Sequence, residues 1–256
     1  MTDTRPVVLL QVDAVAKSYG ARKALDGVSI AVGAGEFVAL LGPNGAGKST
    51  LFQLLSGLFV ADGGRIEICG HDIRRSPVRA LAHIGIVFQQ PTLDLDLSVE
   101  RNLMFHARLH GIGSGEARRR IERELTTQGL LERRKDRVRD LSGGNRRKVE
   151  LARAMVHEPR VLLMDEATVG LDPGSRATLL AQVHGLCESR GVGVLWTSHL
   201  VDEAEAADRI VLLHQGKVRA EGTPAALVAS AGAETLAGAF AQLTEGAAKA
   251  PETTPA

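Results

Sequence analysis

Nine consecutive residues limit what this chain can fold into more than any other stretch. In order, they are Gly42, Pro43, Asn44, Gly45, Ala46, Gly47, Lys48, Ser49 and Thr50. The run follows an apolar, strand-like segment at 37–41 and precedes a helix-like segment at 51–58. It fits the pattern G-x-x-x-x-G-K-[ST], in which a tight loop joins a strand to a helix. We therefore expect a strand, a glycine-rich loop and a helix in immediate succession.

The residue types of this loop suit phosphate. Glycines at 42, 45 and 47 permit backbone conformations that a Cβ would exclude, and they let the backbone approach a ligand. Consecutive N–H groups at the positive end of the following helix then surround phosphate oxygens. Lys48 adds a positive charge for the β- and γ-phosphates, and the Ser49 hydroxyl completes a Mg²⁺ shell. The alternative, a glycine-rich turn with a chance Lys-Ser pair, leaves the flanking strand and helix unexplained. The sequence thus predicts a nucleoside triphosphate and Mg²⁺ as ligands.

The composition is that of an ordinary soluble protein. With 256 residues, 44% of them hydrophobic, the chain can bury the core of one large α/β domain or of two small ones. No run approaches the ~18 apolar residues that cross a bilayer, and residues 1–6 do not resemble a signal peptide. Cys69 and Cys187 have no metal or redox spacing, which indicates buried thiols in a reducing cytoplasm. A net charge of +1 gives no overall signal for nucleic acid.

The order of apolar runs and turn signals predicts an α/β fold. Residues 7–41 predict a small antiparallel sheet that leads into the first core strand, and residues 62–64 predict a turn before a strand at 65–69. We expect a mostly parallel core sheet and an inserted helical subdomain at about 92–157, all within a domain at 1–230. A short extension at 231–256 is expected to hold one helix at 235–243 and a disordered end at 247–256. The remaining predicted elements are strands at 84–88, 161–164, 192–197, 210–214 and 217–220, and helices at 97–110, 116–130, 144–157, 173–190 and 199–207.

Two carboxylates, Asp165 and Glu166, end the apolar run at 161–164. Ligands of α/β proteins bind at the carboxyl ends of parallel strands. There Asp165 would reach Mg²⁺ through water, and Glu166 would activate or position the water that attacks the γ-phosphate. A solvated strand end explains the pair equally well when it is taken alone. The phosphate-binding loop favours the functional interpretation.

A second glycine-containing helix start contains Leu141, Ser142, Gly143, Gly144 and Asn145. A serine hydroxyl and two glycine amides at a helix N-terminus form an anion site. Leu-Ser-Gly-Gly before a helix resembles the signature of the ATP-binding cassette (ABC) family, a group of ATPases with a P-loop NTPase core. The usual fifth residue is Gln, and Asn145 is a shorter amide with the same hydrogen-bonding groups. The resemblance, over about residues 7–225, implies a head-to-tail dimer in which each signature closes over an ATP held by the partner's phosphate-binding loop.

Four further positions match this family in order. Gln89, preferred over Gln90 because it follows Phe88, matches the glutamine that contacts Mg²⁺ and the attacking water. Asp172 matches the acid of a loop at the dimer interface, His199 the histidine that contacts the γ-phosphate, and Tyr19 the aromatic that stacks on adenine. Taken alone, a histidine at a strand end is more often structural, and a lone tyrosine suits a surface or strand edge.

The resemblance implies an ATPase subunit that drives a separate membrane permease from the inner face of the cell membrane. Segments 90–94, 170–172 and 236–244 resemble exporter-type subunits. Segments 89–99 and 167–172 also resemble a subgroup associated with PQQ-dependent alcohol catabolism. All motifs are intact, so a homodimer is the simpler expectation, and no nucleic-acid partner is expected. The transported substrate is not encoded here, because selectivity resides in the permease.

Two other classes of protein share parts of this pattern. A soluble ATP-driven clamp on DNA would need a long coiled coil, which the 92 residues from Thr50 to Leu141 cannot hold, and ribosomal types carry two cassettes per chain. A kinase or GTPase has no use for the signature, and the chain lacks a guanine-reading Asn-Lys-x-Asp.

The segment 114–150 is basic. It carries twelve Lys/Arg against seven Asp/Glu, a net charge of +5. It can form either a face toward an anionic membrane or a solvated face of ion pairs such as Glu116–Arg120.

Overall fold

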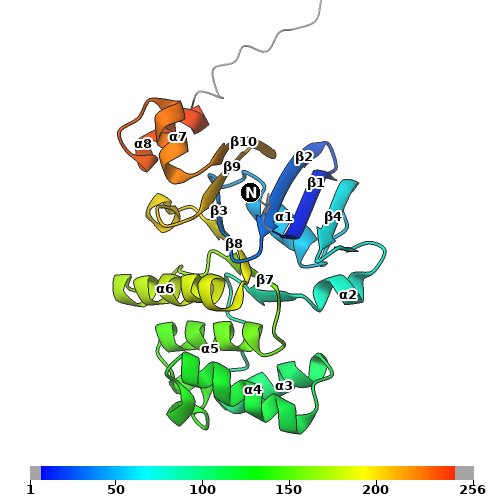
Figure 1. The fold of residues 1–256 in the computed structure, drawn as a ribbon, viewed down its shortest axis with the longest axis vertical. Helices are drawn as coiled ribbons and strands as arrows, with labels where there is room; N and C mark the ends of the chain where they lie inside the picture. The colour runs from blue at the N-terminus through cyan, green and yellow to red at the C-terminus, as the bar shows by residue number, and fades with distance from the viewer. Residues whose placement is uncertain (1–6, 246–256) are drawn as a thin grey trace, which may run out of the picture.

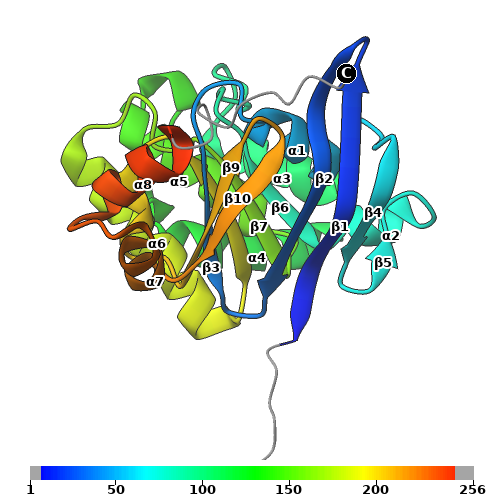
Figure 2. The same cartoon turned by 90° about the horizontal axis from the view of Figure 1, so that it is seen from above.

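Two sheets and a layer of helices make up the chain, which this computed structural model describes over residues 7–245. A six-stranded sheet lies at the centre, a four-stranded sheet lies beside it, and helices α3, α4 and α5 gather at one end (Figures 1 and 2). The α/β class is confirmed, with its antiparallel N-terminal sheet and its helical insertion. The expected disordered end at 247–256 lies outside the described residues.

The central sheet has the strand order β10-β9-β3-β8-β7-β6. All its neighbouring strands are parallel except β9 and β10, which form an antiparallel edge. Every residue of β3 and β8 is buried, because helices and the second sheet leave these strands no solvated face. The strands are β3 Phe37–Leu41, β6 Ile84–Val87, β7 Val161–Asp165, β8 Gly193–Ser198, β9 Arg209–His214 and β10 Lys217–Gly222.

The second sheet is antiparallel, with the order β2-β1-β4-β5. Its two long strands, β1 Val8–Tyr19 and β2 Arg22–Gly33, lie within the segment 7–41 for which the sequence predicted an antiparallel sheet. The predicted turn at 62–64 is wrong, since β4 spans Gly63–Ile68 and turns into β5 (His71–Asp72) through residues 69–70. Gly64 is a glycine for another reason: a Cβ there would stand 2.5 Å from the carbonyl oxygen of Asp13.

Helix α1 (Lys48–Leu55) begins and ends three residues earlier than expected, within the phosphate-binding loop. A short helix, α2 (Pro77–Leu81), was not predicted because it has barely one turn. The helical layer contains α3 Val99–Leu109, α4 Ser114–Thr127 and α5 Gly143–Met155, with 3₁₀ turns at Leu131–Arg133 and Val138–Asp140. Apolar side chains such as Leu103, Leu125 and Val149 give this layer its own core.

Helix α6 (Pro173–Arg190) agrees with the sequence, but the helix expected at 199–207 does not form. Only a 3₁₀ turn, Val201–Ala204, occurs there. The reason is that the Glu203 carboxylate turns inward and accepts hydrogen bonds from Trp196 Nε1 (3.1 Å) and Ser198 Oγ (2.7 Å).

Two helices close the described chain against β9 and β10: α7 Pro224–Ala231 and α8 Leu236–Glu245. The α8 helix was predicted, whereas α7 was missed although Thr223 caps it and Pro224 occupies its first position, both common start signals. Among residues 7–245 no single helix has the length and hydropathy to cross a bilayer, and only the bent pair α7–α8 reaches those limits jointly.

Candidate functional site

The loop at 42–50 joins β3 to α1, as its pattern predicts. Gly47 caps α1 at φ 112°, and a Cβ there would lie 2.7 Å from the Ala24 carbonyl oxygen. At Gly42, a Cβ would collide with the carbonyl oxygen of Leu213. Both glycines are therefore fixed by close approach of other backbone, and the loop folds against β2 and β9.

Lys48 is buried beneath this loop. Its ammonium donates hydrogen bonds to the carbonyl oxygens of Gly42 (2.6 Å) and Pro43 (3.3 Å) and lies 4.0 Å from Glu166 Oε1. Burial lowers the pKa of Lys48, and the nearby carboxylates of Glu166 and Asp165 oppose that shift. The loop thus holds a cation against its own carbonyl oxygens, where an anionic ligand would be a better partner.

The two carboxylates stand at the end of β7. Asp165 Oδ1 accepts a hydrogen bond from Thr197 Oγ1 (2.8 Å), and burial raises the pKa of Asp165. The Glu166 amide donates to both Oγ1 and the carbonyl oxygen of Thr197, each at 3.1 Å. Glu166 takes a left-handed backbone conformation, φ 43°, which turns the chain sharply at the strand end.

Two more side chains meet the Glu166 carboxylate. Gln89 Nε2 donates to Oε2 at 3.3 Å, and His199 Nδ1 lies 3.4 Å from the same oxygen. Segments after β3, β6, β7 and β8 therefore converge at one edge of the sheet. The structure brings together the side chains of Lys48, Glu166, Gln89 and His199.

A cavity of about 390 Å³ opens over the phosphate-binding loop. It is lined by Tyr19, Arg22, Ala24, residues 43–50 and Glu166. The ring of Tyr19 is 45% exposed at the rim. Its position agrees with a stacking surface for a planar ligand, and its neighbour Arg22 adds a charge that the sequence analysis did not single out.

The signature lies apart from this cavity. None of residues 141–145 lines it, and Ser142 Oγ instead caps α5 by accepting from the Asn145 amide (3.4 Å). A Cβ on Gly144 would stand 2.6 Å from Ser175 Oγ. Ser175 in turn donates its hydroxyl to Asp172 Oδ2 (2.6 Å), and its amide donates to Oδ1 (2.9 Å). The signature and Asp172 are therefore neighbours at the starts of α5 and α6.

Three residues that support these elements were missed. Thr197 bonds to the Asp165 carboxylate and to the backbone amide of Glu166, as described above. Arg147 of α5 donates to the carbonyl oxygens of Phe88 (2.7 Å) and Gln89 (3.1 Å), so the signature helix holds the segment that carries Gln89. Buried Glu203 also accepts from Thr168 Oγ1, which joins the turn before Asp172 to the strand before His199. No local sequence signal marks such long-range contacts.

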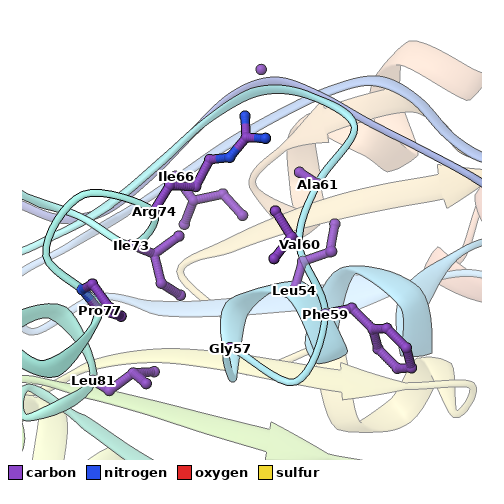
Figure 3. Close-up of a pocket in the computed structure, with 11 residues that line it drawn as sticks. Leu54, Gly57, Phe59, Val60, Ala61, Ile66, Ile73, Arg74, Pro77 and Leu81 are labelled. Carbon is purple, nitrogen blue, oxygen red and sulfur yellow. The ribbon is translucent and has the colours of Figure 1, made fainter.

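A second hollow, of about 330 Å³, lies beyond the far end of α1 (Figure 3). It is lined mainly by apolar side chains, with the Arg74 side chain among them. Leu54, Phe59, Val60, Ile66, Ile73 and Leu81 surround it. Leu58 and Val78 nearby are 63% and 82% exposed. This part of the surface is therefore unusually apolar for a solvated one.

The sequence matches the family profile described as ABC transporter over residues 25–169. It is 40% identical to the linearmycin resistance ATP-binding protein LnrL of Bacillus subtilis, over 89% of this chain and 73% of that protein. It is also 40% identical to the Nod factor export ATP-binding protein I of Paraburkholderia xenovorans, over 88% of this chain and 74% of the relative.

Comparison with solved structures indicates the same family as the profile and the relatives. An ATP-binding subunit of an ABC transporter superposes with a TM-score of 0.82 at 31% identity, covering 92% of this chain and 99% of that one. The dimeric bacterial ABC transporter cassette MJ0796 superposes with a TM-score of 0.75 at 26% identity, over 84% and 98% of the two chains. With the profile, the relatives and the fold in agreement, this chain belongs to the ABC transporter family of ATP-binding proteins.

Proposed function

We propose that this chain binds MgATP in the cavity over residues 42–50 and hydrolyses it. The observation that carries the proposal is the meeting of Lys48, Gln89 and His199 around the Glu166 carboxylate. Lys48 exchanges its carbonyl contacts for the β- and γ-phosphates. Glu166 accepts the proton of the attacking water or orients that water, Gln89 positions it, and His199 contacts the γ-phosphate.

The oxygen donors in the cavity and next to its Glu166 side fit Mg²⁺. The Ser49 hydroxyl, the Gln89 amide and the Asp165 carboxylate are hard ligands of the kind that Mg²⁺ prefers. Asp165 is a partly buried carboxylate whose pKa is raised by burial, so a cation would stabilise its charged form. When bound, the ion neutralises charge on the phosphates. Thr197 holds Asp165 in place for that role.

The nucleotide site is completed, in this proposal, by a second copy of the chain. The signature at 141–145 and Asp172 stand outside the cavity of their own chain. A head-to-tail pair places the signature of one chain over the ATP of the other, so two ATP molecules lie between them. The dimeric form of MJ0796 supports this arrangement.

A separate membrane permease is the proposed partner, with export as the direction and the inner face of the cell membrane as the location. The names of the relatives, resistance and export ATP-binding proteins, support this direction. We assign the apolar hollow beyond α1 to a cytoplasmic helix of the permease. Exposed Leu58, Phe59, Val60 and Val78 beside it are the surfaces that such a contact would bury. The narrower resemblance to a subgroup associated with PQQ-dependent alcohol catabolism stays a prediction.

The basic segment 114–150 contributes less to a membrane contact than its charge suggests. Many of its arginines are paired: Arg120 with Glu116 (2.6 Å), Arg133 with Asp136 (2.8 Å) and buried Arg147 with Glu150 (2.6 Å). Exposed pairs of this kind stabilise little, but they reduce the free charge available to lipid. This favours the solvated face of ion pairs.

Co-purification from the native cells tests the proposal. We expect the tagged chain in the membrane fraction with one polytopic protein, and Val78→Asp should release it without changing ATP hydrolysis by the isolated chain. Arg118→Asp, on the exposed face of α4, is the matched control. Recovery with nucleic acid or ribosomes would contradict the transporter assignment and support a soluble ATP-driven clamp.

A further inference from the structure

Three histidines meet where the helical layer joins the central sheet. His106 lies in the last turn of α3 and His110 follows directly at its end, while His157 follows α5 just before β7. One ring nitrogen from each lies within 4.8 Å of the other two. No residue of the proposed ATPase site belongs to this group.

The backbone brings the rings together from two directions. His106 and His110 are four residues apart, which places them on one helix face. The ring of His157 stacks on that of His110 with centroids 3.8 Å apart and planes inclined by 13°. The centroids of His106 and His110 are 4.6 Å apart.

Two of the nitrogens are buried without a hydrogen-bond partner among residues 7–245: His106 Nε2 and His157 Nδ1. His157 Nε2 donates to the Ile84 carbonyl oxygen (2.8 Å), so it carries the proton and Nδ1 presents a lone pair. Metal-bound histidines usually donate their second nitrogen to a carbonyl or carboxylate in this way. Buried polar atoms without partners are uncommon in folded proteins, so each of these nitrogens needs a partner, which a water molecule or a metal ion can supply.

We propose that His106, His110 and His157 bind a divalent transition-metal ion, with Zn²⁺ as the first candidate. Three neutral imidazoles with water as a fourth ligand form a well-suited tetrahedral zinc site. Zinc–nitrogen bonds of about 2.0–2.1 Å require the three nitrogens to approach to about 3.3 Å. His110 is exposed, so rotation of its side chain away from the stacked position is the movement that would close the site.

The residues around the three histidines determine how tightly the site can bind a cation. Burial lowers the pKa of His106 to about 3 and of His157 to about 4, so these ligands are neutral at pH 7. The charges of Arg153 and Arg120, which also lower the pKa of His157, oppose a cation. Glu158 pairs with Arg120 at 3.0 Å and offsets that charge, which leaves Arg153 as the main unfavourable neighbour.

A bound ion would join α3 to the connection between α5 and β7. Through His157 and the Ile84 carbonyl oxygen it would also reach β6 of the central sheet. The inference thus concerns how rigidly the helical layer is attached, and it does not depend on the proposed ATPase reaction.

Metal binding is tested on the full chain without an affinity tag or nucleotide, in excess Mg²⁺ to occupy oxygen sites. We expect one Zn²⁺ per chain in competition with a chromophoric chelator, and visible absorption bands of tetrahedral Co²⁺ when Co²⁺ replaces it. Zinc should also raise the melting temperature. His110→Gln should weaken zinc binding at least tenfold and abolish the shift.

The matched control is His71→Gln, which alters a histidine stacked on His83 (centroids 5.7 Å apart) far from the cluster in sequence. It should bind zinc as the unaltered chain does. Because His110 is exposed, its variant should fold, and circular dichroism checks this. Equal zinc affinity of the unaltered chain and His110→Gln, or equal losses in both variants, would overturn the proposal.

Discussion

The phosphate-binding loop and the signature are both glycine-containing helix starts, yet the structure treats them differently. The loop at 42–50 is enclosed by β2, β7 and β9, and its Lys48 contacts groups from its own chain. The signature at 141–145 caps its own helix, contacts the start of α6 through Gly144 and buries Leu141 in the core of the helical layer, while Ser142 and Gly143 are exposed. One element is surrounded by its own fold, whereas the other presents its free N–H groups outward.

The contrast between the two helix starts indicates where a second molecule is needed. A Cβ on Gly143 would meet nothing within 4 Å, whereas a Cβ on Gly47 would collide with β2. Contacts within one chain explain why residue 47 is glycine, but they do not explain why residue 143 is glycine. In the proposed dimer the open space at Gly143 is filled by the partner's nucleotide.

We expect the greatest loss of ATPase activity from a substitution beside the phosphate-binding loop. Glu166→Gln removes the carboxylate that would take the proton from water, so turnover should fall about 10²–10⁴-fold while ATP stays bound. Phosphate release and nucleotide retention measure the two properties. Glu205→Gln, an exposed glutamate on the adjoining turn, is the control. Near-normal turnover would remove Glu166 from its proposed role.

A second substitution distinguishes the role of the signature from that of the phosphate-binding loop. In the Glu166→Gln background, ATP should convert the chain into a dimer, and Gly143→Asp should weaken that dimer about thirtyfold, because a like charge facing phosphate costs about 2 kcal/mol or more. Light scattering with and without ATP measures this. ATP binding to the monomer should change less than threefold.

Gly113→Asp is its control. Gly113 caps α4 and Gly143 is the first residue of α5, and a Cβ at either position meets open space, so the fold tolerates both changes alike. If Gly143→Asp weakens ATP binding to the monomer as much as Lys48→Ala does, the two regions are not separate and the comparison fails.

We expect a smaller loss of activity from a substitution of Thr197, which bonds to Asp165 and to the Glu166 amide. Thr197→Val keeps the shape of the side chain but removes the hydroxyl that bonds to Asp165 and to the Glu166 amide. Stability should fall by about 1–3 kcal/mol because buried groups lose partners. Turnover should drop about tenfold, with the dimer retained; thermal unfolding and phosphate release are the measurements. Thr197→Ser should restore most of both.

The smallest effect is at the rim. Tyr19→Ala should weaken ATP binding by about 0.5–1.5 kcal/mol, up to about tenfold, through loss of stacking on adenine. Tyr19→Trp should preserve affinity. Titration with a fluorescent ATP analogue measures both, and an unchanged affinity for Tyr19→Ala would assign the ring to the surface.

Much of this fold was predictable because its strands are buried on both sides. Continuous apolar runs such as Phe37–Leu41 and Val161–Met164 have few alternatives, and a glycine loop or a carboxylate pair at their ends marks the sheet edge. Local sequence patterns gave wrong predictions where contacts between residues far apart in the sequence determine the structure. Gly64 was assigned to a turn, but it is glycine because the β1 backbone passes close to it. Residues 199–207 have a helical pattern, but the side chain of Glu203 is directed into the core. The roles of Gln89 and His199 beside Glu166 were implied by the family resemblance, whereas the bonds of Thr197 and Arg147 join residues far apart in the sequence and became visible only in the structure.

The backbone of Glu166 has a consequence for any attempt to improve this protein. A residue with a Cβ at φ 43° carries roughly 1–2 kcal/mol of conformational strain that glycine would largely avoid. A library selected only for resistance to heat should therefore favour glycine at position 166. The variants that survive best would be the ones that have lost the carboxylate, so screens on this scaffold need to select for turnover and thermal tolerance together.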